Sequence, residues 1–213
     1  GYVGRWRAPS EGDEYWNRFF TRRPAYAPRW SVGEGRILRL QRSISCLVRA
    51  ARKPVVFKNL YLSVRLWPLV DHFPDALFIV VRRDEVANAH SILKARKELT
   101  GSYGSWFSVE PRRYERLKRL PVYKQAVEQI RDIYGLIAEV KEECDGSRFL
   151  EIDYEEFCKD TRREMSRMAS FFARHGLHPR RRFDIPRRFK VRKKVAIDRR
   201  LYKRMAAYAR KRS

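Results

Sequence analysis

The hydrophobic positions along this chain alternate between helical spacing and short continuous runs. From Ile37 to about Arg52 the apolar residues recur every three or four positions, which predicts a helix that ends before Pro54. Residues 55–57 then form a continuous apolar run, which is typical of a strand buried on both faces. A second helix is predicted over residues 61–73. The pattern therefore predicts the order helix, strand, helix over residues 37–73.

The clearest strand covers residues 76–82, directly after a turn at Phe73-Pro74-Asp75. Asp84 is placed to cap a helix that runs to about Arg96. After a loop, Pro121 opens a long amphipathic helix. Strand and helix thus follow one another a second time.

The last third of the chain repeats the order. Residues 149–152 predict a third strand, Thr161 and Glu164 form a capping box for the next helix, and Asp198 can cap a final one. Strands alternating with helices predict an α/β domain of three layers, in which a parallel sheet is flanked by helices. We expect the strands near 54–58, 76–82 and 148–153 to be parallel.

The 213 residues are enough for one domain with a sizeable core. We expect a single domain over residues 1–213. Residues 1–33 are rich in aromatic residues and predict a wrapping loop with one short helix near 11–20. Residues 34–178 form the α/β core, and residues 179–213 form a basic C-terminal segment.

Charge is the strongest compositional signal. The chain carries 49 Lys and Arg against 25 Asp and Glu, a net charge of +24. Residues 179–213 alone hold sixteen basic and two acidic residues, so the charge is concentrated at the C-terminal end. A basic surface indicates an anionic partner such as nucleic acid, a membrane surface, a polyanion or a phosphate-rich cofactor. Composition alone favours nucleic acid.

Two other classes are disfavoured. No run approaches the eighteen apolar residues of a membrane span. The three cysteines, Cys46, Cys144 and Cys158, are widely spaced and match no zinc or disulfide pattern. We therefore expect no metal, no membrane span and a reducing, cytoplasmic location.

Candidate chemistry lies where the strand at 76–82 ends. In an open α/β sheet, ligands bind beyond the carboxyl ends of the strands. Arg83 follows the strand and a helix begins there, so a planar guanidinium meets free backbone N–H groups. Ser91 lies eight residues further on and can face the same ligand. Glu155-Glu156, after the third strand, indicates helix-start acids rather than a catalytic pair. Alone, this pattern favours a solvated arginine and a surface serine.

The pattern extends over several elements and resembles the sulfotransferase family, whose R-[DN]-P-x-x-x-x-x-S signature follows a strand-ending lysine and an FPDA-like turn. The elements that carry the resemblance, in order, are Lys58-Asn59-Leu60, Phe73-Pro74-Asp75-Ala76, Arg83-Asp84, Ser91, the loop Leu99–Pro111 and Tyr154-Glu155-Glu156-Phe157-Cys158. The resemblance covers roughly residues 10–200. It implies a fold like that of the P-loop NTPases and transfer of a sulfuryl group from 3′-phosphoadenosine-5′-phosphosulfate (PAPS).

The resemblance also implies roles for individual residues. Arg83 and Ser91 match the pair that binds the 3′-phosphate of the nucleotide, and Lys58 matches the lysine that approaches the sulfuryl group. By position and charge, Arg192, Lys193 and Lys194 match a basic loop that returns to the nucleotide phosphates. The acceptor would be a hydroxyl or amine of a small molecule or carbohydrate.

Three departures from the family pattern qualify this hypothesis. The first strand and its Gly-Ser/Thr-rich phosphate loop, which would precede residue 1, are not among the 213 residues. We therefore expect an unfilled sheet edge with exposed apolar surface, and a truncated chain that transfers no sulfuryl group. Glu85 stands in place of the signature proline, and Leu60 in place of a catalytic histidine. The sequence supplies no convincing base, because its four histidines read as packing or capping residues.

Two alternatives stay open. A non-catalytic homologue would bind RNA or another polyanion, a reading favoured by the net charge and by Phe183, Phe189 and Tyr202 interleaved with arginines. A structural remnant would bind nothing. No nucleic-acid-binding motif is present, so sulfuryl transfer is the leading hypothesis.

Overall fold

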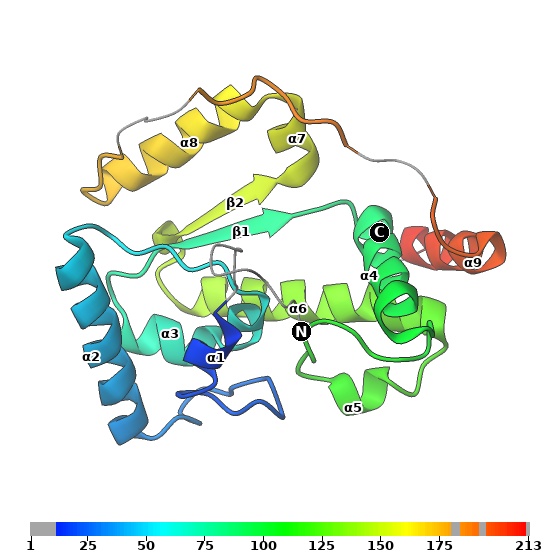
Figure 1. The fold of residues 1–213 in the computed structure, drawn as a ribbon, viewed down its shortest axis with the longest axis horizontal. Helices are drawn as coiled ribbons and strands as arrows, with labels where there is room; N and C mark the ends of the chain where they lie inside the picture. Colours follow the sequence, from blue (N-terminus) through cyan, green and yellow to red (C-terminus); the bar gives the residue numbers. More distant parts are fainter. Residues whose placement is uncertain (1–11, 180–183, 192–194, 212–213) are drawn as a thin grey trace. The chain divides into compact units, whose positions relative to one another are not determined.

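The computed structural model describes residues 12–179, 184–191 and 195–211, which form two compact units (Figure 1). The helical unit contains residues 12–76, 108–115 and 132–144. The sheet unit contains residues 77–107, 116–131 and the described residues from 145 onward. Helix α6, Val122–Glu143, contributes its first part to the sheet unit and its second part to the helical unit.

The helical unit is built around short helices and buried aromatic side chains. Its elements are α1 (Asp13–Trp16), α2 (Glu34–Ala51), the 3₁₀ helix η1 (Leu60–Val64) and α3 (Leu66–His72). On α2, Ile37 and Leu40 lie one turn apart and are both buried, which confirms the helical spacing read from the sequence. The guanidinium of Arg29 donates to both carboxylate oxygens of Asp71, at 3.0 and 2.9 Å. This pair holds the segment that precedes α2 against α3.

The prediction of a strand near 54–58 is wrong for this structure, in which no strand is assigned to those residues. The segment is extended, but only one side of it is covered. The ring of Phe57 stacks on Tyr15 at 5.9 Å and meets Trp16 edge-on at 5.0 Å, whereas Val56 is 84% exposed. The apolar run thus reflects contact with the N-terminal aromatic residues on one face, not burial within a sheet.

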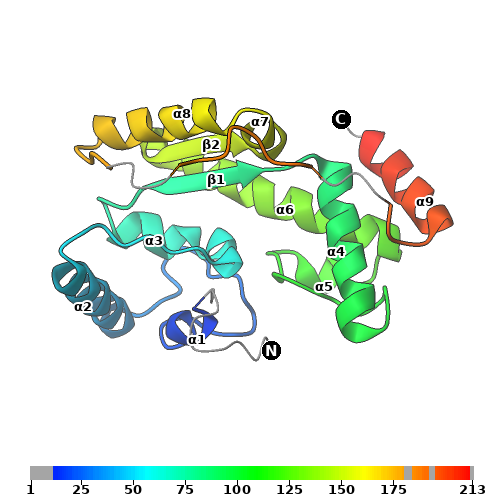
Figure 2. The same cartoon turned by 45° about the horizontal axis from the view of Figure 1, so that its top comes forward.

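The sheet unit contains two parallel strands, β1 (Phe78–Arg82) and β2 (Phe149–Asp153). They pair in register from Phe78 with Phe149 to Arg82 with Asp153, which confirms two of the three predicted strands and their direction. Figures 1 and 2 show α7 (Tyr154–Lys159) and α8 (Thr161–Arg174) lying along this small sheet. Leu150, Ile152 and Phe171 form its buried core, and partly buried apolar side chains pack against them: Leu77, Ile79, Phe157, Met168 and Phe172.

The remaining elements are α4 (Glu85–Thr100), α5 (Tyr114–Leu117), η2 (Gly146–Arg148) and α9 (Arg199–Arg210). Helix α9 buries Met205, Ala206 and Ala209, and it lies beside α4 in both views (Figures 1 and 2). The basic end of the chain is therefore a packed amphipathic helix over these residues, as its spacing predicted.

The N-caps of three helices can be compared with those predicted from the sequence. Asp84 accepts the Ala87 N–H at 2.8 Å and Asp198 accepts the Leu201 N–H at 2.8 Å, so both predicted caps are confirmed. The predicted cap of α8 is wrong by one residue, because Asp160 accepts the Arg163 N–H at 3.2 Å. Thr161 is the first helical residue, and its hydroxyl donates to the Phe157 carbonyl. An ionised carboxylate is the better acceptor for a helix N–H than a hydroxyl.

The structure is therefore a mixed arrangement of helices with a small parallel sheet, consistent with an α/β fold of the predicted class. Among the described helices, none combines the length and the apolar character needed to cross a bilayer. The single-domain reading with its three segments stays a prediction.

Candidate functional site

Two helices begin side by side where the parallel strands end. Arg82 and Asp153 are paired in register at the carboxyl edge, and α4 and α7 follow directly. Asp153 caps α7 by accepting the Glu156 N–H at 2.9 Å, as Asp84 caps α4. Helix N-termini keep backbone N–H groups without intrahelical partners and carry positive potential. This edge of the sheet is therefore suited to an anion.

Arg83 lies at this edge and is held without a close hydrogen bond. Its guanidinium sits 5.0 Å from the centre of the Tyr154 ring, and its Nε is 3.9 Å from Glu155 Oε1. Both of these atoms are buried, and the distance is too long for a hydrogen bond. No described residue accepts a hydrogen bond from Arg83. The side chain is thus oriented by a ring and a carboxylate. Its Nε is buried, and its two terminal nitrogens have no described acceptor.

Glu155 is a residue of this site that sequence reasoning missed. Its Oε2 accepts the backbone N–H of Asp84 at 3.1 Å, and its other oxygen faces Arg83. The carboxylate therefore ties the start of α4 to the start of α7. A signal was present in the sequence, because parallel pairing of strands that end in Arg82 and Asp153 places the residues after them together.

Ser91 belongs to the same helix that starts at this edge. It is exposed on α4 and follows Asp84 by seven residues and Ala87 by four, so the three share one face of the helix. Arg83 and Ser91 thus belong to one unit and one strand–helix junction. Their joint contact with a phosphate stays a prediction.

Comparison with known proteins decides the family. The model of the sulfotransferase family matches residues 7–175, which is most of the chain. The chain belongs to the sulfotransferase family. Comparison with curated proteins and with solved structures gave no significant match. The matched region contains Lys58, Arg83 and Ser91 and ends before Arg192, so the family match covers the first three sites only.

In this sulfotransferase, Glu85 is neutralised by a partner. Arg131 of α6 donates two hydrogen bonds to the Glu85 carboxylate, Nε to Oε1 at 2.8 Å and Nη2 to Oε2 at 2.7 Å. The same guanidinium donates to the Ala209 carbonyl of α9 at 2.8 Å. The hydrogen bond that Arg131 donates to Glu85 is the main cause that raises the pKa of Arg131. The negative charge that replaces the signature proline is therefore compensated by a bidentate ion pair.

We expect Arg131→Ala to weaken the binding of adenosine 3′,5′-bisphosphate by roughly three- to tenfold, because it leaves Glu85 as an uncompensated charge in the first turn of α4. Adding Glu85→Gln to Arg131→Ala should restore most of the affinity, and Glu85→Gln alone should change it little. Calorimetric titration of the original chain and the three variants gives the four affinities of this double-mutant cycle. A double variant as weak as Arg131→Ala would show that charge at residue 85 is irrelevant to the nucleotide.

Arg192, Lys193 and Lys194 of the sulfotransferase lie outside the described residues, but the chain on both sides of them is anchored. Before them, the Phe189 N–H donates to the Cys158 carbonyl of α7 at 2.7 Å. After them, the Ala196 N–H donates to His90 Nε2 of α4 at 3.0 Å. These anchors join α7 and α4, the two helices that begin at the strand ends. The contact of Arg192, Lys193 and Lys194 with the nucleotide phosphates stays a prediction.

His90 is a neutral acceptor in this arrangement. Its ring also meets Tyr202 of α9 edge-on, with centroids 5.8 Å apart. Burial, followed by the positive charges of Arg83 and Lys94, lowers the pKa of His90 below its ordinary value of 6.5. A protonated imidazole has no lone pair at Nε2 and cannot accept the Ala196 N–H.

Acidification should therefore loosen residues 195–211. The folded state holds fewer protons on His90 than the unfolded state, so the contribution of this bond is present above pH 6.5 and is lost as the pH falls through the lowered pKa. Hydrogen exchange of these residues, corrected for the intrinsic effect of pH, should rise between pH 7.5 and pH 5. In His90→Gln, whose amide oxygen accepts without titrating, the protection should not change with pH. An equal rise in that variant would assign the effect to other groups.

Lys58 lies in the helical unit, in the extended segment before η1, and it is exposed. The next residue, Asn59, caps η1 by accepting the Tyr61 N–H at 2.8 Å and donates to Asp13 at 2.6 Å. The end of the segment is thereby fixed next to Lys58. The approach of Lys58 to a sulfuryl group stays a prediction. Within the described ranges, no three His, Cys, Asp or Glu side chains are grouped as metal ligands.

Proposed function

We propose that this sulfotransferase moves a sulfuryl group from PAPS to a hydroxyl or amine of a small molecule or carbohydrate. The observation that supports it most is Arg83, a guanidinium at the end of β1 that is oriented by Tyr154 and Glu155 with its hydrogen-bond donors unused. In α/β folds, nucleotides bind where a strand ends and the next helix begins. Arg83 is at such a position, within the residues that match the sulfotransferase family.

The roles follow from charge and position. Arg83 and Ser91 bind the 3′-phosphate, the arginine by a charge-assisted fork and the serine by its hydroxyl. Arg192, Lys193 and Lys194 add positive charge around the nucleotide phosphates. Lys58 stabilises the charge that develops as the acceptor oxygen or nitrogen bonds to sulfur and the bond from sulfur to the 5′-phosphate oxygen breaks. The nucleotide product is adenosine 3′,5′-bisphosphate.

The proposal includes a limit on these 213 residues. Their one stretch rich in Gly, Ser and Thr, residues 100–105, follows α4 and not the family's first strand, so we do not expect it to supply backbone donors to the 5′-phosphosulfate. Each such charge-assisted contact contributes roughly 1.5–3 kcal/mol, so two of them account for a factor of about one hundred or more in affinity. We expect weak binding of the bisphosphate and no sulfuryl transfer by this chain alone. The three-layer sheet of the P-loop type belongs to the same proposal.

RNA binding is the competing function, and the described contacts weigh against it. Stacking of bases needs accessible aromatic faces. The ring of Phe189 lies parallel to Phe157 at 6.2 Å, and Tyr202 is packed on His90. Each of these two rings thus has one contact within its own chain, and Phe189 keeps 47% of its surface exposed, so the argument against stacking is stronger for Tyr202 than for Phe189.

The decisive experiment measures ligand preference. The chain should bind adenosine 3′,5′-bisphosphate at least tenfold more tightly than adenosine 5′-monophosphate, because only the former has the 3′-phosphate for Arg83 and Ser91. Incubation with ³⁵S-labelled PAPS and a panel of hydroxyl and amine acceptors should give no labelled product. Equal affinity for the two nucleotides would refute the assigned phosphate site, and labelled product would refute the need for a phosphate loop.

A further inference from the structure

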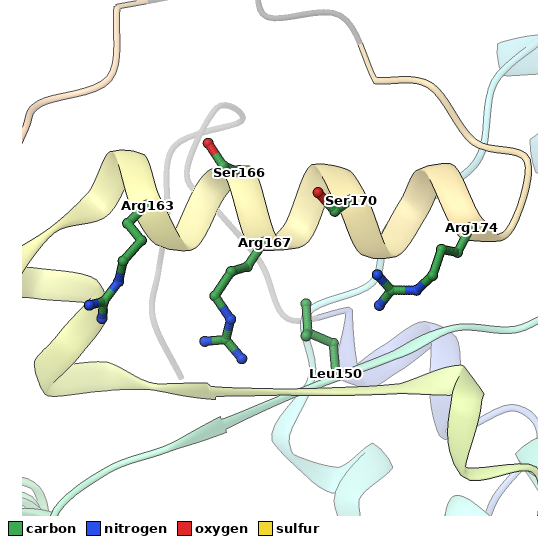
Figure 3. A pocket seen from close by; sticks show the side chains of 6 residues that line it. All are labelled: Leu150, Arg163, Ser166, Arg167, Ser170 and Arg174. Carbon is green, nitrogen blue, oxygen red and sulfur yellow. The ribbon is translucent and has the colours of Figure 1, made fainter.

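A groove between α8 and β2 carries arginines that the proposed reaction does not use. It is a cavity of about 380 Å³ with Leu150 of β2 on one side and five residues of α8 on the other, namely Arg163, Ser166, Arg167, Ser170 and Arg174. Figure 3 shows the three arginine side chains reaching from α8 towards β2, with Leu150 among them. We call it the α8 groove. No residue that lines it belongs to the β1–α4 junction.

Positive charge in the α8 groove is only partly neutralised. Arg163 binds Glu156 at 2.8 Å and Glu164 at 3.1 Å, and Arg167 also binds Glu164. Arg174 has no ion pair with any described residue. The sequence holds no acidic residue between Glu164 and Asp184. The groove therefore becomes more positive from the first to the last turn of α8.

The spacing of the arginines suits an extended anion. Arg163 and Arg174 are eleven residues apart, which is about 16 Å along a helix, and Arg167 lies between them on the same side. Arginine presents a planar fork that matches carboxylate and sulfate groups. A ligand with negative groups repeated along a chain can meet Arg174 and the donors that Arg163 and Arg167 do not give to Glu156, Glu164 and the Glu151 carbonyl, whereas one small anion meets a single arginine.

Nucleic acid fits this lining poorly. Proteins that bind single strands place aromatic rings against the bases, and no residue that lines the α8 groove is aromatic. Two serines and one leucine complete the surface. The Ser166 hydroxyl donates to the Arg162 carbonyl at 3.0 Å, so the Ser170 hydroxyl and the Leu150 side chain are the groups that suit a sugar ring.

We propose that the α8 groove binds an acidic carbohydrate chain, one that carries carboxylate or sulfate groups. The inference does not rest on sulfuryl transfer, since the groove shares no residue with the nucleotide site. It predicts binding of the carbohydrate in the absence of any nucleotide.

A heparin-derived octasaccharide is the probe, and Arg174→Ala is the test variant. This substitution removes an exposed side chain without an ion pair, so the fold should be unaffected, whereas Arg167→Ala would leave the buried Glu164 with one partner fewer. Arg162→Ala is the matched control, because it removes the same charge from the same helix outside the groove. We expect Arg174→Ala to weaken octasaccharide binding about tenfold and Arg162→Ala less than twofold.

A second pair inserts a charge instead of removing one. Ser170→Asp places a carboxylate inside the groove and should weaken binding at least tenfold, while Ala169→Asp places it on the neighbouring exposed position and should weaken it less than threefold. Affinity for adenosine 3′,5′-bisphosphate should be unchanged in Arg174→Ala, which separates this site from the nucleotide site. If the two variants of each pair lost octasaccharide affinity equally, the binding would depend on the overall positive charge and not on the groove, and the proposal would be overturned. Tighter binding of a twelve-residue poly-uridylate or poly-glutamate, dependent on Arg174, would overturn it in favour of nucleic acid or acidic peptide.

Discussion

Replacing Arg83 with alanine is expected to weaken the binding of adenosine 3′,5′-bisphosphate by roughly 10- to 100-fold. The Nε of Arg83 is buried, but its two terminal nitrogens have no described acceptor and can bind a phosphate, and a hydrogen bond to a charged group contributes about 1.5–3 kcal/mol. The loss should be confined to the 3′-phosphate, which means that adenosine 5′-monophosphate should bind the variant and the original chain alike. Calorimetric titration with both nucleotides measures it.

The neighbouring arginine is the control. Arg82 has the same charge, one residue earlier in the strand, but its Nε donates to Glu151 at 2.6 Å. Arg82 is thus held against β2, whereas Arg83, the residue after β1, contacts Tyr154 and Glu155. Arg82→Ala should therefore change nucleotide affinity less than threefold. A loss in Arg82→Ala as large as that in Arg83→Ala would show that net charge, not the position of Arg83, determines binding.

The largest effect on stability is expected at Arg96, a fully buried residue of α4. Its guanidinium donates to Gln125 at 2.7 Å and to Gln129 at 3.2 Å, and it lies 4.7 Å from the centre of the Trp106 ring. Arg96→Ala leaves two buried amide oxygens without this donor and opens a cavity. We expect the free energy of unfolding to fall by about 3–5 kcal/mol.

Urea denaturation of the variant and of Lys94→Ala measures this effect. Lys94 lies on the same helix and forms an exposed pair with Glu98, so its replacement should change the free energy of unfolding by about 0.5 kcal/mol or less. If Arg96→Ala were no less stable than Lys94→Ala, the network of Arg96 with the α6 glutamines would contribute nothing to the fold.

Sequence alone predicted the parts of the fold that local pattern determines. The strands at 78–82 and 149–153, the helices after them and the caps Asp84 and Asp198 were readable because each depends on residues within a few positions. The extended segment at 54–58 was misread, because a short apolar run does not reveal which partner covers it. Here the cover comes from Tyr15 and Trp16, forty residues earlier.

At the candidate site too, the sequence predicted some residues and missed others. Arg83 and Ser91 could be chosen from their places after a strand and on a helix, with the family resemblance added. Arg131 could not, because its part depends on the side chain of Glu85, which it meets across the fold, whereas Glu155 could have been placed at the site from the parallel pairing of the two strands that precede Arg83 and Tyr154. In particular, Glu85, which stands in place of the signature proline, is paired with a residue 46 positions away.

The most direct test of the central claim compares the two nucleotides by their effect on backbone amide resonances of the chain. Adenosine 3′,5′-bisphosphate and adenosine 5′-monophosphate differ only in the 3′-phosphate, so the difference between the two sets of shifts marks where that phosphate binds. The account predicts that the largest differences fall at residues 83–91, at the end of β1 and the first turns of α4. Equal shifts at these residues, with the differences concentrated elsewhere, would contradict it.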